Sequence, residues 1–123
     1  MALSIRTTDD IWVVGTNAAI YRSSDRGEQW QKIKPPAQTE GAEFRDVEAL
    51  DNGVVIVMSA GSGKDSNIYR SSDNGLNWTK VLQASDERAF FNCMTFEDDD
   101  LGWLYGDAVA GQLFVLKTVN GGV

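Results

Sequence analysis

Apolar residues in this chain are gathered into short runs, and clusters of Gly, Asp, Asn and Ser separate one run from the next. Within several runs apolar and polar residues alternate, and β-branched and aromatic residues are frequent, which is typical of β-strands with one buried face. No segment keeps a helical spacing of apolar positions over the length that a helix needs. The pattern predicts an all-β fold of antiparallel hairpins, with strands in IWVVG, AIYRS, WQKIK, FRDVEAL, GVVIVMSA, NIYRS, WTKVL, FFNCMTF, LGWLYG and LFVLKTV.

One phrase occurs twice along the chain. It reads IYRSSDRGEQW from Ile20 and IYRSSDNGLNW from Ile68, and a shorter third copy, LKTVNGG, begins at Leu116. An acidic turn that leads into a strand precedes each copy, beginning at Asp9, Asp51 and Asp98. A repeat of about 48 residues made of four short strands has the size of one β-propeller blade.

The repeat divides the chain into blade 1 at residues 1–40, blade 2 at 41–87 and an incomplete blade 3 at 88–123. The predicted fold is therefore a partial β-propeller of about two and a half four-stranded antiparallel blades. Closed propellers have about four to eight blades, so an arc of this size leaves apolar blade faces uncovered. Because the sequence stops inside the third copy, we expect a fragment of a longer chain. The alternative is a homo-oligomer in which several copies close one ring.

The repeated phrase holds a hydroxyl, a carboxylate, a glycine and an indole at fixed offsets. In a hairpin between the third and fourth strands of a blade, the oxygens can accept hydrogen bonds from turn amides and the glycine supplies a positive φ. The tryptophan then serves as a packing anchor. We predict a structural role for these residues, which are Ser23, Asp25, Gly27 and Trp30, then Ser71, Asp73, Gly75 and Trp78, and in the third copy Asn120 and Gly122.

On these motifs the chain resembles the Asp-box, or BNR repeat, family of sialidase-like β-propellers, since S-x-D-x-G-x-x-W occurs twice at blade spacing. Its acidic turns, its IYR strands and the segments FRDVEA and AFFNCMTF are similar to bacterial BNR proteins of the photosystem II assembly factor type. The resemblance implies a non-enzymatic scaffold that binds a protein partner. It also implies an exported protein, although MALSIRTTDD contains no visible signal peptide. The third copy departs from the pattern, with Val119 and Asn120 in place of Ser and Asp.

Two other functions are open for this family. One is a sialidase-like glycoside hydrolase whose catalytic residues lie mainly on other blades, and the second is an oligomeric lectin-like ring that binds glycans. Sialidases resemble one another in an arginine triad, whereas here Phe44-Arg45 is followed by Asp46-Val47 instead of Ile-Pro. We therefore predict no catalytic residues in this chain, a protein as the partner, and a glycan as the alternative ligand.

A candidate binding rim is predicted at the start of two innermost strands. Arg45, Asp46 and Glu48 begin one of these strands, where side chains reach the central channel of a propeller. Asn92 aligns with Asp46 in the next blade. The rim is expected to contact the partner.

Composition excludes several classes of function. With 18 acidic and 11 basic residues the net charge is -7, whereas a nucleic-acid binder needs a clustered basic face. The chain has no histidine, which removes the usual zinc sites and the Ser-His-Asp and Cys-His nucleophiles, and EDDD lacks the spacing of a calcium loop. No metal or cofactor is predicted.

Cys93 is the only cysteine, and its apolar neighbours predict a buried thiol. No apolar run reaches membrane-spanning length.

Overall fold

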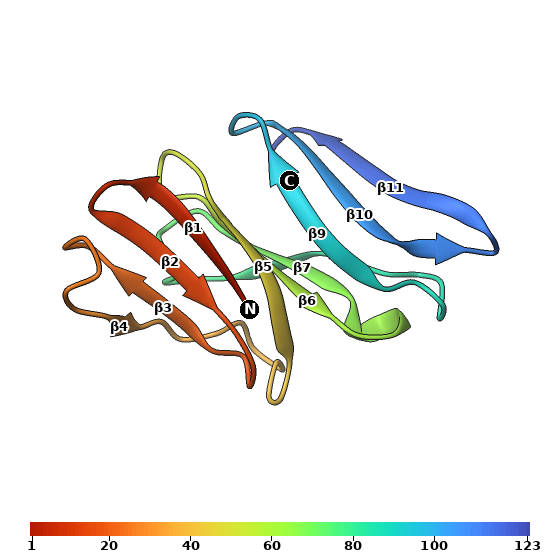
Figure 1. Ribbon diagram of the computed structural model, residues 1–123, viewed down its shortest axis with the longest axis horizontal. Helices are drawn as coiled ribbons and strands as arrows, with labels where there is room; N and C mark the ends of the chain where they lie inside the picture. Colours follow the sequence, from red (N-terminus) through yellow and green to blue (C-terminus); the bar gives the residue numbers. More distant parts are fainter.

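The computed structural model describes all 123 residues, which form three antiparallel sheets lying side by side (Figure 1). The only helical element is a 3-10 turn at Gly63–Asp65, and no helix is long and apolar enough to cross a membrane. The strands are β1 (Ala2–Thr7), β2 (Asp10–Val14), β3 (Ile20–Ser23) and β4 (Gln31–Lys32), then β5 (Glu43–Ala49), β6 (Val55–Ala60), β7 (Asn67–Ser71) and β8 (Thr79–Gln83), and finally β9 (Phe91–Phe96), β10 (Leu101–Val109) and β11 (Gln112–Val119).

Each sheet is a meander in which consecutive strands pair. The first strands of the three sheets, β1, β5 and β9, pack against one another in that order and form a row through the middle of the molecule (Figure 1). Successive sheets that meet along their first strands are the arrangement of propeller blades around an axis. The predicted all-β partial propeller is confirmed.

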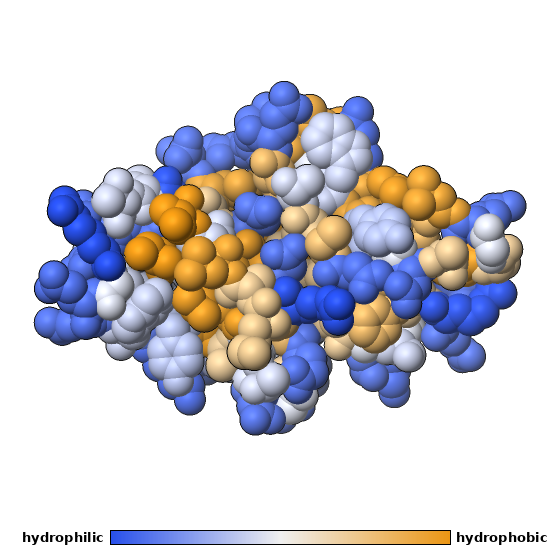
Figure 2. Space-filling view, in the orientation of Figure 1, coloured by the Kyte–Doolittle hydropathy of each residue, from blue (hydrophilic) through white to orange (hydrophobic).

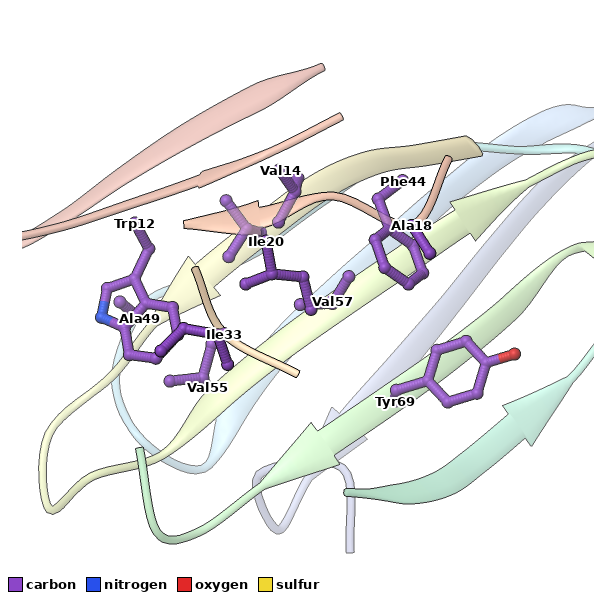
Figure 3. Packing of buried hydrophobic residues seen from close by; sticks show 11 residues of the cluster. Trp12, Val14, Ala18, Ile20, Ile33, Phe44, Ala49, Val55, Val57 and Tyr69 are labelled. Atoms are coloured by element: carbon purple, nitrogen blue, oxygen red, sulfur yellow. The ribbon is translucent and has the colours of Figure 1, made fainter. Parts of the chain in front are cut away.

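The first two sheets share one apolar core, which Figure 3 shows from close by. Alternate residues of β2 and β3 point toward the second sheet, because successive side chains of a strand face opposite sides. Trp12 and Ile20 are fully buried there against Val55 and Val57 of β6. Burial of this apolar surface is the main attraction between the two sheets.

A second core joins the second and third sheets. Ile56 and Met58 of β6 pack with Phe91 and Met94 of β9 and with Leu104 of β10. Strand β6 is therefore buried on both faces, which explains why GVVIVMSA is a continuous apolar run without alternation.

The prediction of a buried thiol at Cys93 is wrong. Its neighbour Met94 is buried against the second sheet, whereas Cys93 lies on the opposite face of β9 and is exposed. It is paired in register with Tyr105, which is also exposed. The run AFFNCMTF indicated a strand buried on both faces, but no further sheet covers this face.

Candidate functional site

The two full copies of the repeated phrase form hairpins with the same hydrogen bonds. In the second sheet the Ser71 hydroxyl donates to the Asp73 carboxylate at 2.7 Å and accepts from the Gly75 amide at 2.8 Å. The same Asp73 oxygen accepts from the Asn77 amide at 2.8 Å. In the first sheet the corresponding bonds, among Ser23, Asp25, Gly27 and Gln29, measure 2.8, 2.8 and 2.9 Å.

The third copy folds into the same turn with different side chains. Thr118 takes the place of the serine, donating to the Asn120 amide oxygen at 2.8 Å and accepting from the Gly122 amide at 3.0 Å. The Asn120 side chain also donates to the carbonyl of Val123 at 3.0 Å. A hydroxyl followed two residues later by a side-chain acceptor is therefore enough to close the turn.

The carboxylates of the two boxes are occupied by these turns. The Asn77 side-chain amide, the Asn77 backbone amide and the Ser71 hydroxyl lower the pKa of Asp73 to about 2. The Gln29 backbone amide, followed by the Ser23 hydroxyl, lowers the pKa of Asp25. A carboxylate that accepts hydrogen bonds as an anion is a poor proton donor. The hydrogen bonds of both boxes therefore fit a structural role in their hairpins.

The glycine and tryptophan of the second box contact the first sheet. Gly75 has a φ of +80°, and a Cβ there would lie 2.7 Å from Ile33 and 3.3 Å from Trp12. The Trp78 indole donates to the carbonyl of Lys34 at 3.0 Å. Trp30, the counterpart in the first box, is 44% exposed. The box of one blade therefore also contacts the blade before it.

Two rim residues lie at β-bulges of neighbouring inner strands. The pairing of β5 with β6 passes from Phe44 to Asp46 and leaves Arg45 as an extra residue. The pairing of β9 with β10 leaves Asn92 as an extra residue in the same way. Asn92 therefore corresponds to Arg45, and the sequence alignment of Asn92 with Asp46 is wrong by one position. Bulges of this kind bend a strand and redirect its side chains.

Arg45 and Asn92 are in contact. The Arg45 Nε donates to the Asn92 carbonyl at 3.2 Å, and the guanidinium carbon lies 5.6 Å from the centroid of the Phe90 ring. The Asn92 side chain donates to Asp107 at 2.6 Å. The terminal nitrogens of Arg45 make no hydrogen bond, and no carboxylate forms a salt bridge with them. A positioned cation with free donors is thus available at the rim.

Asp46 and Glu48, the other two rim residues, form an acidic pair between β5 and the third sheet. The Asp46 carboxylate accepts from the Met94 amide at 2.7 Å and from the Val47 amide at 2.9 Å. Burial raises its pKa despite these bonds. Burial, followed by the charge of Asp46, raises the pKa of Glu48 to about 7. Asp46 therefore joins β5 to β9, while Glu48 changes charge near neutral pH.

No three side chains of Cys, Asp and Glu are grouped so that they could hold a metal ion. The hairpins and the row of inner strands together define the class: this chain is a partial β-propeller, and its first two blades each carry an Asp-box hairpin. A family model described as "BNR-Asp box repeat" matches residues 20–33, and no curated protein sequence matches the chain significantly.

Solved structures with a similar fold include two of YCF48. One, described as YCF48 bound to D1 peptide, has a TM-score of 0.78 at 13% identity, and YCF48 from Cyanidioschyzon merolae has 0.74 at 20%. The alignment covers 98% of this chain and 37% of each YCF48 chain. An ancestral GH74 enzyme has a TM-score of 0.68 at 17% identity, with 98% of this chain and 17% of the enzyme covered. The fold is shared with all three, and this chain spans well under half of their length.

Proposed function

We propose that this propeller segment is a non-enzymatic scaffold that binds a protein partner at the rim around Arg45. The observation that carries the proposal is the unpaired guanidinium of Arg45, held by the Asn92 carbonyl and the Phe90 ring. A cation fixed in this way loses little side-chain entropy on binding, and its parallel donors fit a carboxylate. The partner segment is therefore an acidic one, either an acidic side chain or a free C-terminus.

Two other exposed arginines provide the contrast that supports this choice. Arg26 is paired with Asp9 at 2.7 Å, and Arg88 is paired with Asp86 at 2.7 Å. Their charges are already balanced within the chain, whereas the charge of Arg45 is not. The YCF48 structure described as bound to D1 peptide supports peptide binding as a capacity of this fold.

The experiment measures binding of fluorescent peptides to the 123-residue chain by anisotropy, with peptides that differ in acidic residues and in free or amidated C-termini. Arg45→Ala should weaken binding of the best peptide by about 10-fold or more, because hydrogen bonds to charged groups contribute about 1.5–3 kcal/mol. Arg88→Ala is the matched control and should bind like the unmodified chain. If no peptide binds, or if Arg45→Ala binds unchanged, the proposal is wrong.

Hydrolase activity is tested with a panel of fluorogenic glycosides. Glu48 is the carboxyl whose pKa lies near neutrality, so Glu48→Gln is the informative variant. We expect no turnover from the unmodified chain. Turnover that Glu48→Gln abolishes would contradict the non-enzymatic part of the proposal and favour the glycoside hydrolase.

A further inference from the structure

The face of the second sheet that packs on the first sheet changes from apolar to polar toward the turn between β6 and β7. Val57 and Tyr69 are paired on this face and belong to the core that the two sheets share. Successive side chains of a strand point to opposite faces, so the next pair on the same face is Ser59 and Asn67. Both residues are buried. Two polar side chains therefore continue a row of apolar core residues.

The neighbouring blades hold no polar side chain at this position. Counted from the box hairpins, the equivalent pair is Gly15 and Ala19 in the first sheet, and Gly106 and Phe114 in the third. Phe114 stacks on Phe91 of β9 with ring centroids 6.0 Å apart, so an aromatic contact occupies this position in the core of the second and third sheets. The polar pair is therefore a property of the second blade and not a requirement of the fold.

In the second blade the polar pair lies at the floor of a groove of about 390 Å³, which we call the linker groove. One wall is residues 38–43, the linker that leads from the first sheet into β5, and the other is formed by Ala60, Gly61 and Asp65. In Figure 2 the tip of this linker, at the lower edge of the molecule below β5, consists mainly of hydrophilic residues. The groove belongs to the junction of two sheets that are in contact, and neither outer face of the molecule contributes to it.

Asn67 carries a buried acceptor without a partner at this floor. Its side-chain nitrogen donates to the Lys64 carbonyl at 2.9 Å, which fixes the orientation of the amide. The Ser59 hydroxyl donates to the Asp65 carbonyl at 2.7 Å, so its proton is not available to Asn67. The Asn67 Oδ1 makes no hydrogen bond. Buried polar atoms are nearly always hydrogen-bonded, and a bound donor is one explanation of an exception.

Every charged side chain that lines the linker groove is acidic. Glu40 and Glu43 lie on the linker wall, and Asp65 lies on the opposite wall. All three are exposed, and none takes part in a salt bridge. Burial raises the pKa of Tyr69, the Ser59 hydroxyl opposes this shift, and the charge of Asp65 adds to it. The field of Asp65 therefore reaches the floor, and a cleft lined by charges of one sign concentrates ions of the opposite sign.

From these features we infer that the linker groove binds the guanidinium or ammonium group of a cationic ligand. The carboxylates of the two walls accept its N–H donors, and the Asn67 oxygen accepts one at the floor. The carboxylates are not grouped closely enough to hold a metal ion, so the groove fits an extended cation. A guanidinium fits better than an ammonium, because its five donors lie in a planar fork that can reach both walls. The linker groove takes the opposite charge from Arg45, so its ligand binds whether or not a peptide binds at the rim.

Groups of this kind occur on free amines and on the basic side chains of proteins, so the test uses a probe of each kind. The isotope-labelled chain is titrated with agmatine and with a capped Gly-Arg-Gly peptide, and its amide signals are followed by NMR. The signals of the linker and of the Asn67 side chain should shift and saturate. A capped peptide with citrulline in place of the arginine has the same shape without the charge, and it should bind about 10-fold more weakly.

The combination of Glu43→Gln with Asp65→Asn removes one carboxylate from each wall. It should weaken binding of both guanidinium probes about 10-fold, as expected for the loss of two exposed ion pairs. Glu28→Gln with Glu97→Gln is the matched control, because it removes two exposed carboxylates that do not line the groove. The control should bind within about 2-fold of the unmodified chain, since salt screens distant charges. The dispersion of the amide signals checks folding, and Glu40→Gln replaces a substitution that prevents it.

Saturable shifts at the groove, weaker binding of the citrulline peptide and of the wall variant, and an unchanged control support the inference. The guanidinium probe that binds more tightly then identifies the source of the ligand, a free amine or a protein side chain. The inference is overturned if neither probe gives a saturable shift up to about 10 mM, or if the shifts are confined to other residues. Equal binding of the citrulline peptide, unchanged binding to the wall variant, or an equal loss in the control also overturns it.

Discussion

Replacement of Ser71 by Ala tests the main structural role assigned to the boxes. The Ser71 hydroxyl is buried. It accepts a hydrogen bond from the Gly75 amide at 2.8 Å and donates one to the Asp73 carboxylate at 2.7 Å. Gly75 is itself buried between the first and second sheets, so water cannot replace the lost acceptor. An unsatisfied buried amide costs about 1–3 kcal/mol, and we expect Ser71→Ala to lower the free energy of unfolding by that amount.

The matched control is Ser23→Ala in the first box. The Ser23 hydroxyl accepts a hydrogen bond from the Gly27 amide at the same distance, 2.8 Å, but Gly27 is half-buried and open to water. The expected loss there is about 0.5–1.5 kcal/mol, the net worth of an ordinary hydrogen bond. Urea unfolding followed by tryptophan fluorescence measures both. The reasoning is refuted if Ser71→Ala unfolds at the same urea concentration as the unmodified chain, or if Ser23→Ala loses as much stability as Ser71→Ala.

Three further outcomes are expected. The lowered pKa of Asp73 stabilises the folded state at pH values above about 4, and this stabilisation is lost as the pH falls from about 4 to about 2. The stability of Asp73→Asn, measured by acid unfolding, should therefore depend less on pH in that range. The raised pKa of Glu48 lowers stability as the pH rises from about 4.5 to about 7, and Glu48→Gln should remove that decline in a series of urea titrations. Gly75→Ala should lower the melting temperature more than Gly27→Ala, because both glycines have a positive φ but only Gly75 abuts Ile33 and Trp12. Equal losses would show that the contact between the two sheets does not contribute to the effect of Gly75→Ala.

Local patterns were enough to predict the fold. Alternation and turn residues indicated strands, and the doubled phrase gave a blade-sized repeat. The hydroxyl, carboxylate and glycine of each box act through bonds that span at most four residues, from Ser71 to Gly75 and from Asp73 to Asn77. Interactions that are closed within one turn depend little on the rest of the chain, so their residues can be recognised from spacing alone.

The rim was harder to predict because it depends on pairing between strands. A β-bulge has no spacing signature in a single strand, since it exists only relative to the neighbouring strand. For this reason the sequence alignment made Asn92 equivalent to Asp46, whereas the strand register shows that Asn92 occupies the same bulge position as Arg45. Cys93 was misjudged for a related reason: the run around it is apolar, but exposure depends on which faces other sheets cover.

The box hairpins have the same turn in all three blades, whereas the residues at the two inner-strand bulges differ. Each box makes the same turn, even where Thr118 and Asn120 replace serine and aspartate. The bulge position, in contrast, holds a cation in one blade and a neutral amide in the next, Arg45 and Asn92. A hairpin needs only a few hydrogen-bonding groups to close, whereas a ligand distinguishes charge from polarity. Under the proposed function, we expect differences between blades at the inner-strand bulges to change binding specificity without loss of the fold. Arg45→Asn should weaken peptide binding strongly while lowering the unfolding midpoint only slightly, because the Arg45 bond to the Asn92 carbonyl is exposed.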